Sequence, residues 1–225
     1  MSSTKGDPEQ PNAASVQASG ETDTVPSALE LEIRELAAER GAAAAATRAI
    51  EGYGGELLGY LFALAKTGED AEELFSELCE KLWRALPQFR WDSSFRTWAY
   101  AIARNLVREA YRQEQRRGRV VGLSSAPEVA NQAQAVRTTT VAYMRTETKQ
   151  RLEVLRNALD EDDRTLLVLR VDRRMAWRDI ARVMTDADTP DADRDLDKLA
   201  AKLRKRFERV KERLKDKLGP SSSGG

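Results

Sequence analysis

The stretch that decides the fold runs from Ala71 to Arg112 and reads AEELFSELCEKLWRAL (71–86), PQFRWDSS (87–94) and FRTWAYAIARNLVREAYR (95–112). In its first part, large apolar residues recur at helical spacing, which predicts an amphipathic helix that stops before Pro87. The same spacing returns in the third part, after an aromatic loop. Strand-like alternation is convincing nowhere along the chain. The sequence therefore predicts an all-α fold.

Outward from this stretch, the periodicity divides the chain into two helical units. Ser27 is a candidate helix cap, with Glu30 three residues later as its capping-box partner. The expected organisation is two domains joined by a flexible linker, so that their separation can vary. It comprises a disordered tail (1–26), a first helical domain (27–112), the linker (113–148), a second helical domain (149–218) with an acidic insertion (185–197), and a second disordered tail (219–225).

Composition excludes several classes of function. The chain of 225 residues has no His and one Cys, so His-based catalysis, a disulfide within the chain and cysteine zinc sites are ruled out. The Asp-rich stretch after residue 185 does not match the calcium-binding loop of an EF-hand. We therefore expect no catalytic residues, no metal site and no cofactor. Because no signal peptide or membrane-spanning run is visible, we expect a cytoplasmic protein.

The formal net charge is zero, with 37 basic and 37 acidic residues, but the charge is unevenly distributed. Residues 81–120 and 198–225 each carry a net charge of +7, whereas residues 1–80 carry −11. Salt screens exposed charges beyond about 8–10 Å, so a local basic patch can attract phosphate in a neutral chain. The two basic segments make nucleic acid a candidate partner.

The first candidate site combines the basic face Arg104, Arg108 and Arg112 with the aromatic loop before it. Arg binds phosphate, Asn105 can read adenine, and exposed aromatic rings can stack on unpaired bases. The alternative is a solvated Arg face over a core that holds the aromatic residues. Phe95 and Trp98 fit the apolar stripe, which leaves Trp91 as the better stacking candidate.

Two further features support binding functions. The C-terminal helices resemble a helix-turn-helix whose basic last helix would enter the major groove, although a basic helix that only packs is the alternative. The acidic helix at 71–86 carries more large apolar residues than one buried face needs. Part of it could face a protein partner, or it could be an ordinary core helix.

Residues 68–117 resemble the second conserved region of the extracytoplasmic-function (ECF) sigma factors of bacterial RNA polymerase. The resemblance rests on motifs spread across the stretch, namely Ala71-Glu72-Glu73, Trp83, Ala85, Leu86, Phe95, Trp98, Ala103-Arg104-Asn105 and Arg112, with Glu109 where the family has Asp. The segment LRKRFERVKERL (203–214) is similar to the end of the family's fourth conserved region. The interval before it is about twelve residues longer here.

The resemblance implies a protein that binds core RNA polymerase and promoter DNA and promotes strand opening. Core polymerase would contact the acidic helix through Glu72, Glu73, Leu74, Glu77, Leu78, Lys81 and Trp83. The −10 element would be read and melted by Phe89, Trp91, Ser93, Ser94, Arg96, Trp98, Arg104, Asn105, Arg108 and Arg112, with a base flipped into a pocket near the loop. The −35 element would be read by Lys202, Arg204, Lys205, Arg206, Arg209 and Arg213.

Two other functions stay open from the sequence alone. One is a stand-alone helix-turn-helix regulator that binds duplex DNA without polymerase. The other is a helical protein that docks on polymerase but reads no promoter. An anti-sigma factor is a possible further partner. The acidic insertion could fold over the basic helix as a phosphate mimic, or it could be a solvated loop.

Overall fold

The computed structural model describes residues 26–116, 159–185 and 195–218, and all regular elements in these ranges are helical. The all-α prediction is confirmed for this part of the chain. The helices are α1 (Ala28–Glu39), α2 (Ala42–Leu64), α3 (Gly68–Ala85), the 3-10 turn η1 (Leu86–Gln88), α4 (Phe95–Arg116), α7 (Glu161–Leu167), the π-helical turn η2 (Val168–Asp172), α8 (Trp177–Met184) and α9 (Leu196–Leu218).

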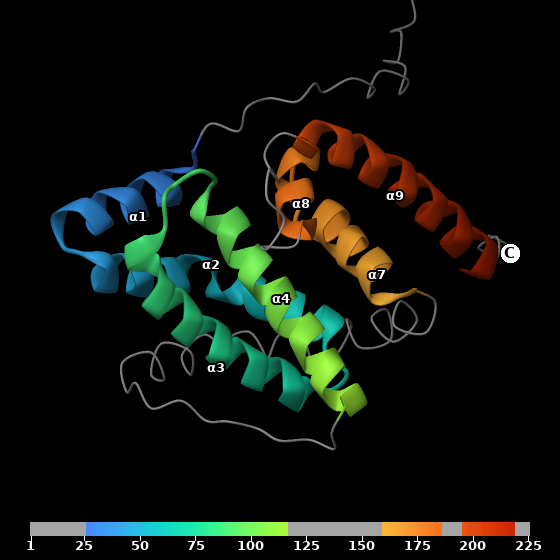
Figure 1. Cartoon of the computed structure of the whole chain (residues 1–225), viewed down its shortest axis with the longest axis horizontal. Coiled ribbons are helices and arrows are strands. Elements are labelled where there is room, and N and C mark those ends of the chain that lie inside the picture. The colour runs from blue at the N-terminus through green and yellow to red at the C-terminus, as the bar shows by residue number, and fades with distance from the viewer. Residues whose placement is uncertain (1–25, 117–158, 186–194, 219–225) are drawn as a thin grey trace, which may run out of the picture.

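Helices α1 to α4 form the N-terminal unit, in which α2 is the central helix (Figure 1). Ala45, Ala46 and Ala49 of α2 and the leucines at its end are buried, because α1, α3 and α4 all pack against this helix. Helix α3 begins with a capping box between Thr67 and Asp70. It ends before Pro87, as the sequence predicts, and the chain turns through η1 into the aromatic loop.

A buried carboxylate joins the first helix of this unit to the last. Ser27 caps α1 as expected, but Glu30 does not complete a capping box there. Its carboxylate crosses the bundle and accepts hydrogen bonds from the backbone N–H groups of Phe95 (2.8 Å) and Arg96 (2.9 Å). The Tyr53 hydroxyl donates to the same carboxylate at 2.9 Å. Glu30 thus caps α4 because the first N–H groups of a helix have no partner within it.

Helices α7, α8 and α9 form the C-terminal unit. The connection from η2 to α8 passes through Arg174, whose φ of 52° lies in the left-handed region. This turn places Trp177 in the core against Phe207 of α9, with ring centroids 5.5 Å apart. Helices α8 and α9 pack on each other. The expected linker beyond Arg116, most of the acidic insertion and the tail residues 1–25 and 219–225 lie outside the described residues.

The two units lie against each other, with α8 packed on α4 and α7 on α2 (Figure 1). Their buried residues form one continuous apolar cluster, which includes Leu106 of α4 and Leu166 of α7. Helix α4 also continues to Arg116, four residues beyond the expected end of the first domain. The described part of the chain is therefore closed, with both basic segments in one body.

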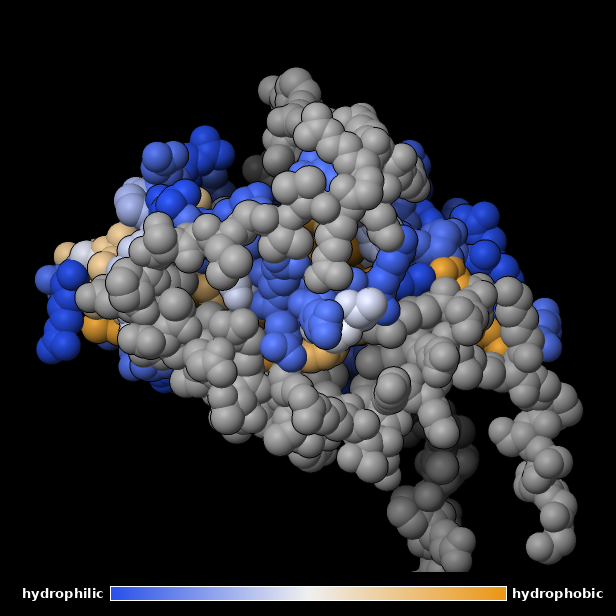
Figure 2. Space-filling model, turned by 90° about the horizontal axis from the view of Figure 1, so that it is seen from below, coloured by the Kyte–Doolittle hydropathy of each residue, from blue (hydrophilic) through white to orange (hydrophobic). Residues whose placement is uncertain are grey.

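On the part of the described surface that is visible in Figure 2, hydrophilic side chains dominate and the hydrophobic areas are small and separate. None of the described helices combines the length and apolarity that a membrane crossing requires. Cys79 is buried in the core of the N-terminal unit.

Replacing the capping carboxylate tests how far α4 depends on it. We expect Glu30→Gln to lower the free energy of unfolding by about 1–3 kcal/mol, because the amide N–H₂ would face at least one group that now donates to the carboxylate. Urea unfolding followed by circular dichroism measures the change. Glu32→Gln is the matched control on the same helix, since it removes only an exposed ion pair with Arg48. Equal stability of the two variants would contradict the capping role.

Candidate nucleic-acid interface

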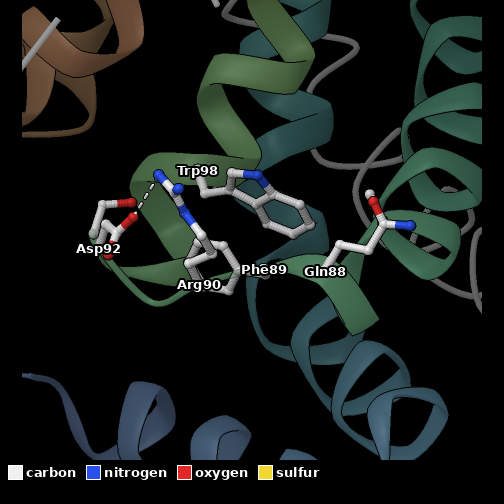
Figure 3. A pocket seen from close by; sticks show the side chains of 7 residues that line it. Gln88, Phe89, Arg90, Asp92 and Trp98 are labelled. Carbon is white, nitrogen blue, oxygen red and sulfur yellow. Dashed lines mark ion pairs between the residues drawn. The ribbon is translucent and has the colours of Figure 1, made fainter. Parts of the chain in front are cut away.

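A hollow of about 370 Å³ lies at the loop between η1 and α4. It is of the size of small-molecule pockets, which start at about 300 Å³. The rings of Phe89 and Trp98 form its aromatic part and stack on each other, with centroids 4.5 Å apart and 21° between their planes (Figure 3). At its mouth, Arg90 and Asp92 form an exposed ion pair of 2.9 Å. The remaining lining residues are Ala85, Gln88 and Ser93.

Trp91 has an unusual backbone conformation beside this hollow. Its φ of 61° lies in the left-handed region, which is strained for an aromatic residue. The ring packs against Phe89 at 4.8 Å and lies under the guanidinium of Arg34 at 5.7 Å. Trp91 is therefore half-buried outside the hollow, and Trp98 supplies the indole that lines it. Phe95 is fully buried, as the apolar stripe predicts.

The first backbone N–H groups of α4 are held by hydrogen bonds to side chains. Ser94 accepts a hydrogen bond from the Thr97 N–H at 3.0 Å and adds to the capping by Glu30. Arg96 points away from the hollow and forms a two-pronged ion pair with Glu56, at 2.6 and 3.0 Å. Of the predicted residues, Phe89, Ser93 and Trp98 line the hollow. Ser94 instead caps the start of α4, and Arg96 faces the C-terminal unit through its hydrogen bond to the backbone carbonyl of Arg173.

The basic face of α4 is divided between solvent and protein. Asn105 and Arg112 are exposed, and Arg108 is half-buried. Arg104, by contrast, is 3% exposed because α7 covers it. Its guanidinium donates to the carboxylate of Asp162 at 2.9 Å. In this closed arrangement, Arg104 cannot reach a phosphate.

On α3, the predicted polymerase-binding residues fall into two groups. Leu74 and Leu78 are buried in the core of the N-terminal unit, so in this arrangement they support the helix from inside. Glu77 and Lys81 are exposed and paired with each other at 3.2 Å. The side chains at the other three predicted positions are half-buried, namely those of Glu72, Glu73 and Trp83.

The basic side chains of α9 have two different environments. Lys202, Lys205 and Arg209 are exposed. Arg206 and Arg213 instead converge on Asp163 of α7, with Arg206 Nε 2.5 Å from the carboxylate. Arg204 lies over the ring of Trp177 at 5.6 Å.

Asp163 is the acidic centre of this arginine cluster and is 1% exposed. Burial alone would raise the pKa of its carboxyl group, but the hydrogen bonds from Arg206 and Arg213 outweigh burial and hold the pKa below its ordinary value. The charged form is therefore favoured inside the fold. Arg206 and Arg213 hold α9 on α7, in addition to any role at DNA.

Comparison with known proteins adds a family to this geometry. Residues 49–117 match the model of sigma-70 region 2, a range that contains the acidic helix, the aromatic hollow and the basic face of α4. Residues 49–117 therefore form a sigma-70 region 2. It is also similar to the RNA polymerase sigma-H factor of Pseudomonas aeruginosa, with 29% identity over 136 residues, which cover 59% of this chain and 70% of that protein. The hollow described above thus lies within its sigma-70 region 2.

Sequence reasoning missed several residues of this interface. Gln88, Arg90 and Asp92 flank the predicted aromatic residues, and their nearness in the sequence was the available signal. Asp162 and Asp163 sit in a short acidic run at the start of a helix, where capping alone explains acidic residues. Nothing in the sequence linked this run to Arg104 or to α9. The expected phosphate mimicry by the acidic insertion involves residues mostly outside the described ranges, although Asp195 pairs with Lys198 at 2.8 Å.

The two environments on α9 predict two different mutant behaviours. Arg206→Ala with Arg213→Ala should lower the free energy of unfolding by about 3 kcal/mol, because Asp163 would stay buried without its partners. Lys205→Ala with Arg209→Ala removes the same charge from the same helix and should change stability little. Urea unfolding of both variants measures the difference.

The pH dependence of the free energy of unfolding provides a second test of the Arg206/Arg213 cluster. The lowered pKa of Asp163 contributes stability above the ordinary carboxyl pKa near 3.8, and this contribution is lost as the pH falls further. The stability gap between wild type and the Arg206/Arg213 variant should therefore narrow in acid. A gap that stays constant or widens below this pH would contradict the role of the cluster.

Proposed function

We propose that this protein directs RNA polymerase to promoters by reading the −10 element with the hollow and the basic face of α4. A stacked pair of aromatic rings, a cavity for one small group and a neighbouring basic helix are together suited to holding an unpaired base beside its own strand. The hollow between η1 and α4, walled by Phe89 and Trp98, is the observation that carries the proposal. The proposal goes beyond the match to sigma-70 region 2, because it assigns the hollow to one step of initiation, the opening of the DNA strands.

Within this proposal, the hollow receives a base flipped out of the duplex. The stacked rings offer an apolar face, and the ion pair of Arg90 and Asp92 supplies donors and acceptors at the mouth. Glu30 holds the start of α4 and therefore fixes Trp98 relative to Phe89. Asn105, Arg108 and Arg112 then bind the strand along the helix, joined by Arg104 once it is uncovered.

The remaining surfaces take the other two macromolecular contacts. Core polymerase binds the exposed acidic side of α3, chiefly through Glu73, Glu77 and Trp83. The −35 element is bound by the exposed basic residues Lys202, Lys205 and Arg209 of α9, with α8 and α9 docked as a helix-turn-helix. We place the protein in the ECF group, acting in the cytoplasm without enzymatic activity or a cofactor, and open to control by an anti-sigma factor. Its two units act as separate domains on the promoter.

Two tryptophan variants separate the steps in transcription assays with core polymerase and a promoter pool. We expect Trp98→Ala to retain core-polymerase affinity but to reduce open-complex formation by roughly 5- to 150-fold, the equivalent of about 1–3 kcal/mol for one lost stacking contact. Permanganate footprinting of unpaired thymines reports the open complex. Trp83→Ala, on α3, should show the reverse pattern, with weaker core binding.

A milder pair of variants excludes misfolding as the explanation. Arg90→Ala removes an exposed side chain at the mouth of the hollow, and Arg84→Ala removes an exposed arginine of α3. Only Arg90→Ala should impair strand opening. If every variant in the loop left open complexes intact while core binding persisted, the protein would be a polymerase-docking regulator. Tight, specific duplex binding without polymerase would instead favour a stand-alone regulator.

A further inference from the structure

Arg34 of α1 lies beside the aromatic loop, although no site predicted from the sequence includes it. Helix α1 lies next to the loop between η1 and α4, and the Arg34 guanidinium is over the ring of Trp91, 5.7 Å from its centroid (Figure 1). This distance is within the range of cation–π contacts. Trp91 in turn packs on Phe89, with ring centroids 4.8 Å apart. The Trp91 ring thus connects the guanidinium of α1 to Phe89, which walls the hollow.

The Arg34 side chain is exposed, and it forms no ion pair within the described ranges. Its surroundings on α1 explain this. Of the four positions one helical turn away, three are apolar, namely Leu31, Ala37 and Ala38. The fourth is Glu30, whose carboxylate is buried and caps α4 instead. The charge of Arg34 is therefore available to an anion from outside the described protein.

The contact with Trp91 leaves the hydrogen-bond donors of Arg34 free. The attraction between a guanidinium and an aromatic ring is electrostatic and does not require an N–H group as a donor. The five N–H groups of arginine form a planar fork that matches the oxygens of a phosphate, and two of them can bind at once. A side chain already held over a ring also loses less conformational freedom when it binds. Trp91 therefore presents Arg34 as a preorganised phosphate ligand.

The backbone of Trp91 supports a specific role for this contact. Its φ of 61° is strained, and such conformations persist only where the surrounding structure imposes them. The ion pair between Arg90 and Asp92, at 2.9 Å, spans the residue and holds the turn. The indole consequently lies at α1 and does not line the hollow. The strained turn thus brings an aromatic ring under Arg34.

We infer that Arg34 binds a phosphate of the DNA strand whose base enters the hollow, and that Trp91 is the positioning residue that holds its guanidinium. This inference rests on the proposed function, because it takes the ligand to be the unpaired strand of the promoter. The hollow reads the base, whereas Arg34 fixes the strand through its backbone, which carries no sequence information. Such a contact strengthens binding to every sequence and makes it depend on salt.

The test measures how tightly the complete protein, bound to core polymerase, binds forked DNA with an unpaired −10 strand at several KCl concentrations. We expect Arg34→Ala to weaken binding about tenfold at low salt, the equivalent of one charge-assisted hydrogen bond. The slope of log K against log salt should fall by about 0.7, the value for one phosphate of a single strand. The preference among bases at the flipped position should stay the same. Fluorescence anisotropy of labelled DNA gives all three quantities.

A second substitution at the same position separates charge from shape. Arg34→Lys keeps the positive charge but loses the planar fork. It should therefore retain the salt slope of the wild type while binding the forked DNA more weakly. A slope that fell as far in Arg34→Lys as in Arg34→Ala would contradict a phosphate contact.

Two control variants test the specificity of the contact. Arg40→Ala removes the same charge from an exposed position at the end of α1 and should change neither affinity nor slope. Trp91→Gly removes the ring but accepts the left-handed backbone, so the loop keeps its turn. In that background, Arg34→Ala should weaken binding less than it does in the wild type, because the guanidinium is no longer positioned.

Three results would overturn the inference. They are equal effects of Arg34→Ala and Arg40→Ala, an unchanged salt slope in Arg34→Ala, and a changed base preference at the flipped position. The last result would mean that Arg34 only shapes the loop around the hollow. Failure of the wild-type protein to open promoters with core polymerase would instead overturn the proposed function.

Discussion

One buried carboxylate, that of Glu30, joins the first helix of the N-terminal unit to the start of α4. The aromatic hollow lies beside this capped helix end, and the basic face of α4 lies further along the same helix. A helix end is a strong constraint, because its first N–H groups must find acceptors wherever the chain places them. Here the acceptor comes from 65 residues earlier in the sequence. The geometry of the loop that precedes α4 therefore depends on the packing of the whole bundle.

Arginine has two uses in this molecule, and carboxylates decide between them. Where an aspartate is buried beside it, as Asp163 is beside Arg206, the arginine stabilises helix packing. Where the carboxylate belongs to the opposite unit, as Asp162 does for Arg104, the same chemistry holds the two units together. Exposed residues such as Lys205 and Arg209 stay available to a ligand. Basic residues that look equivalent in the sequence thus differ through their neighbours.

Much of the fold could be predicted because it follows from local rules. The apolar spacing of α3 and α4, the stop at Pro87 and the burial of Phe95 all need only helical periodicity and the chemistry of proline. The aromatic loop was also recognisable as a candidate site. The choice of Trp98 over Trp91 as the lining indole was not, because it depends on a left-handed backbone at Trp91. The carboxylate partners of Arg104 and Arg206 come from distant sequence, which periodicity cannot reveal.

The pairing of Arg206 and Arg213 with Asp163 affects how strongly DNA binding by α9 would depend on salt concentration. Affinity for DNA falls with salt because each phosphate contact releases condensed counterions, with a slope of about −0.9 per contact. Arginines already neutralised by a buried aspartate exchange few ions when DNA arrives. In the proposed complex with DNA, the C-terminal unit should therefore bind with a shallower dependence on ionic strength than its basic composition suggests. Changes in cellular potassium would then act more on the α4 contacts than on those of α9.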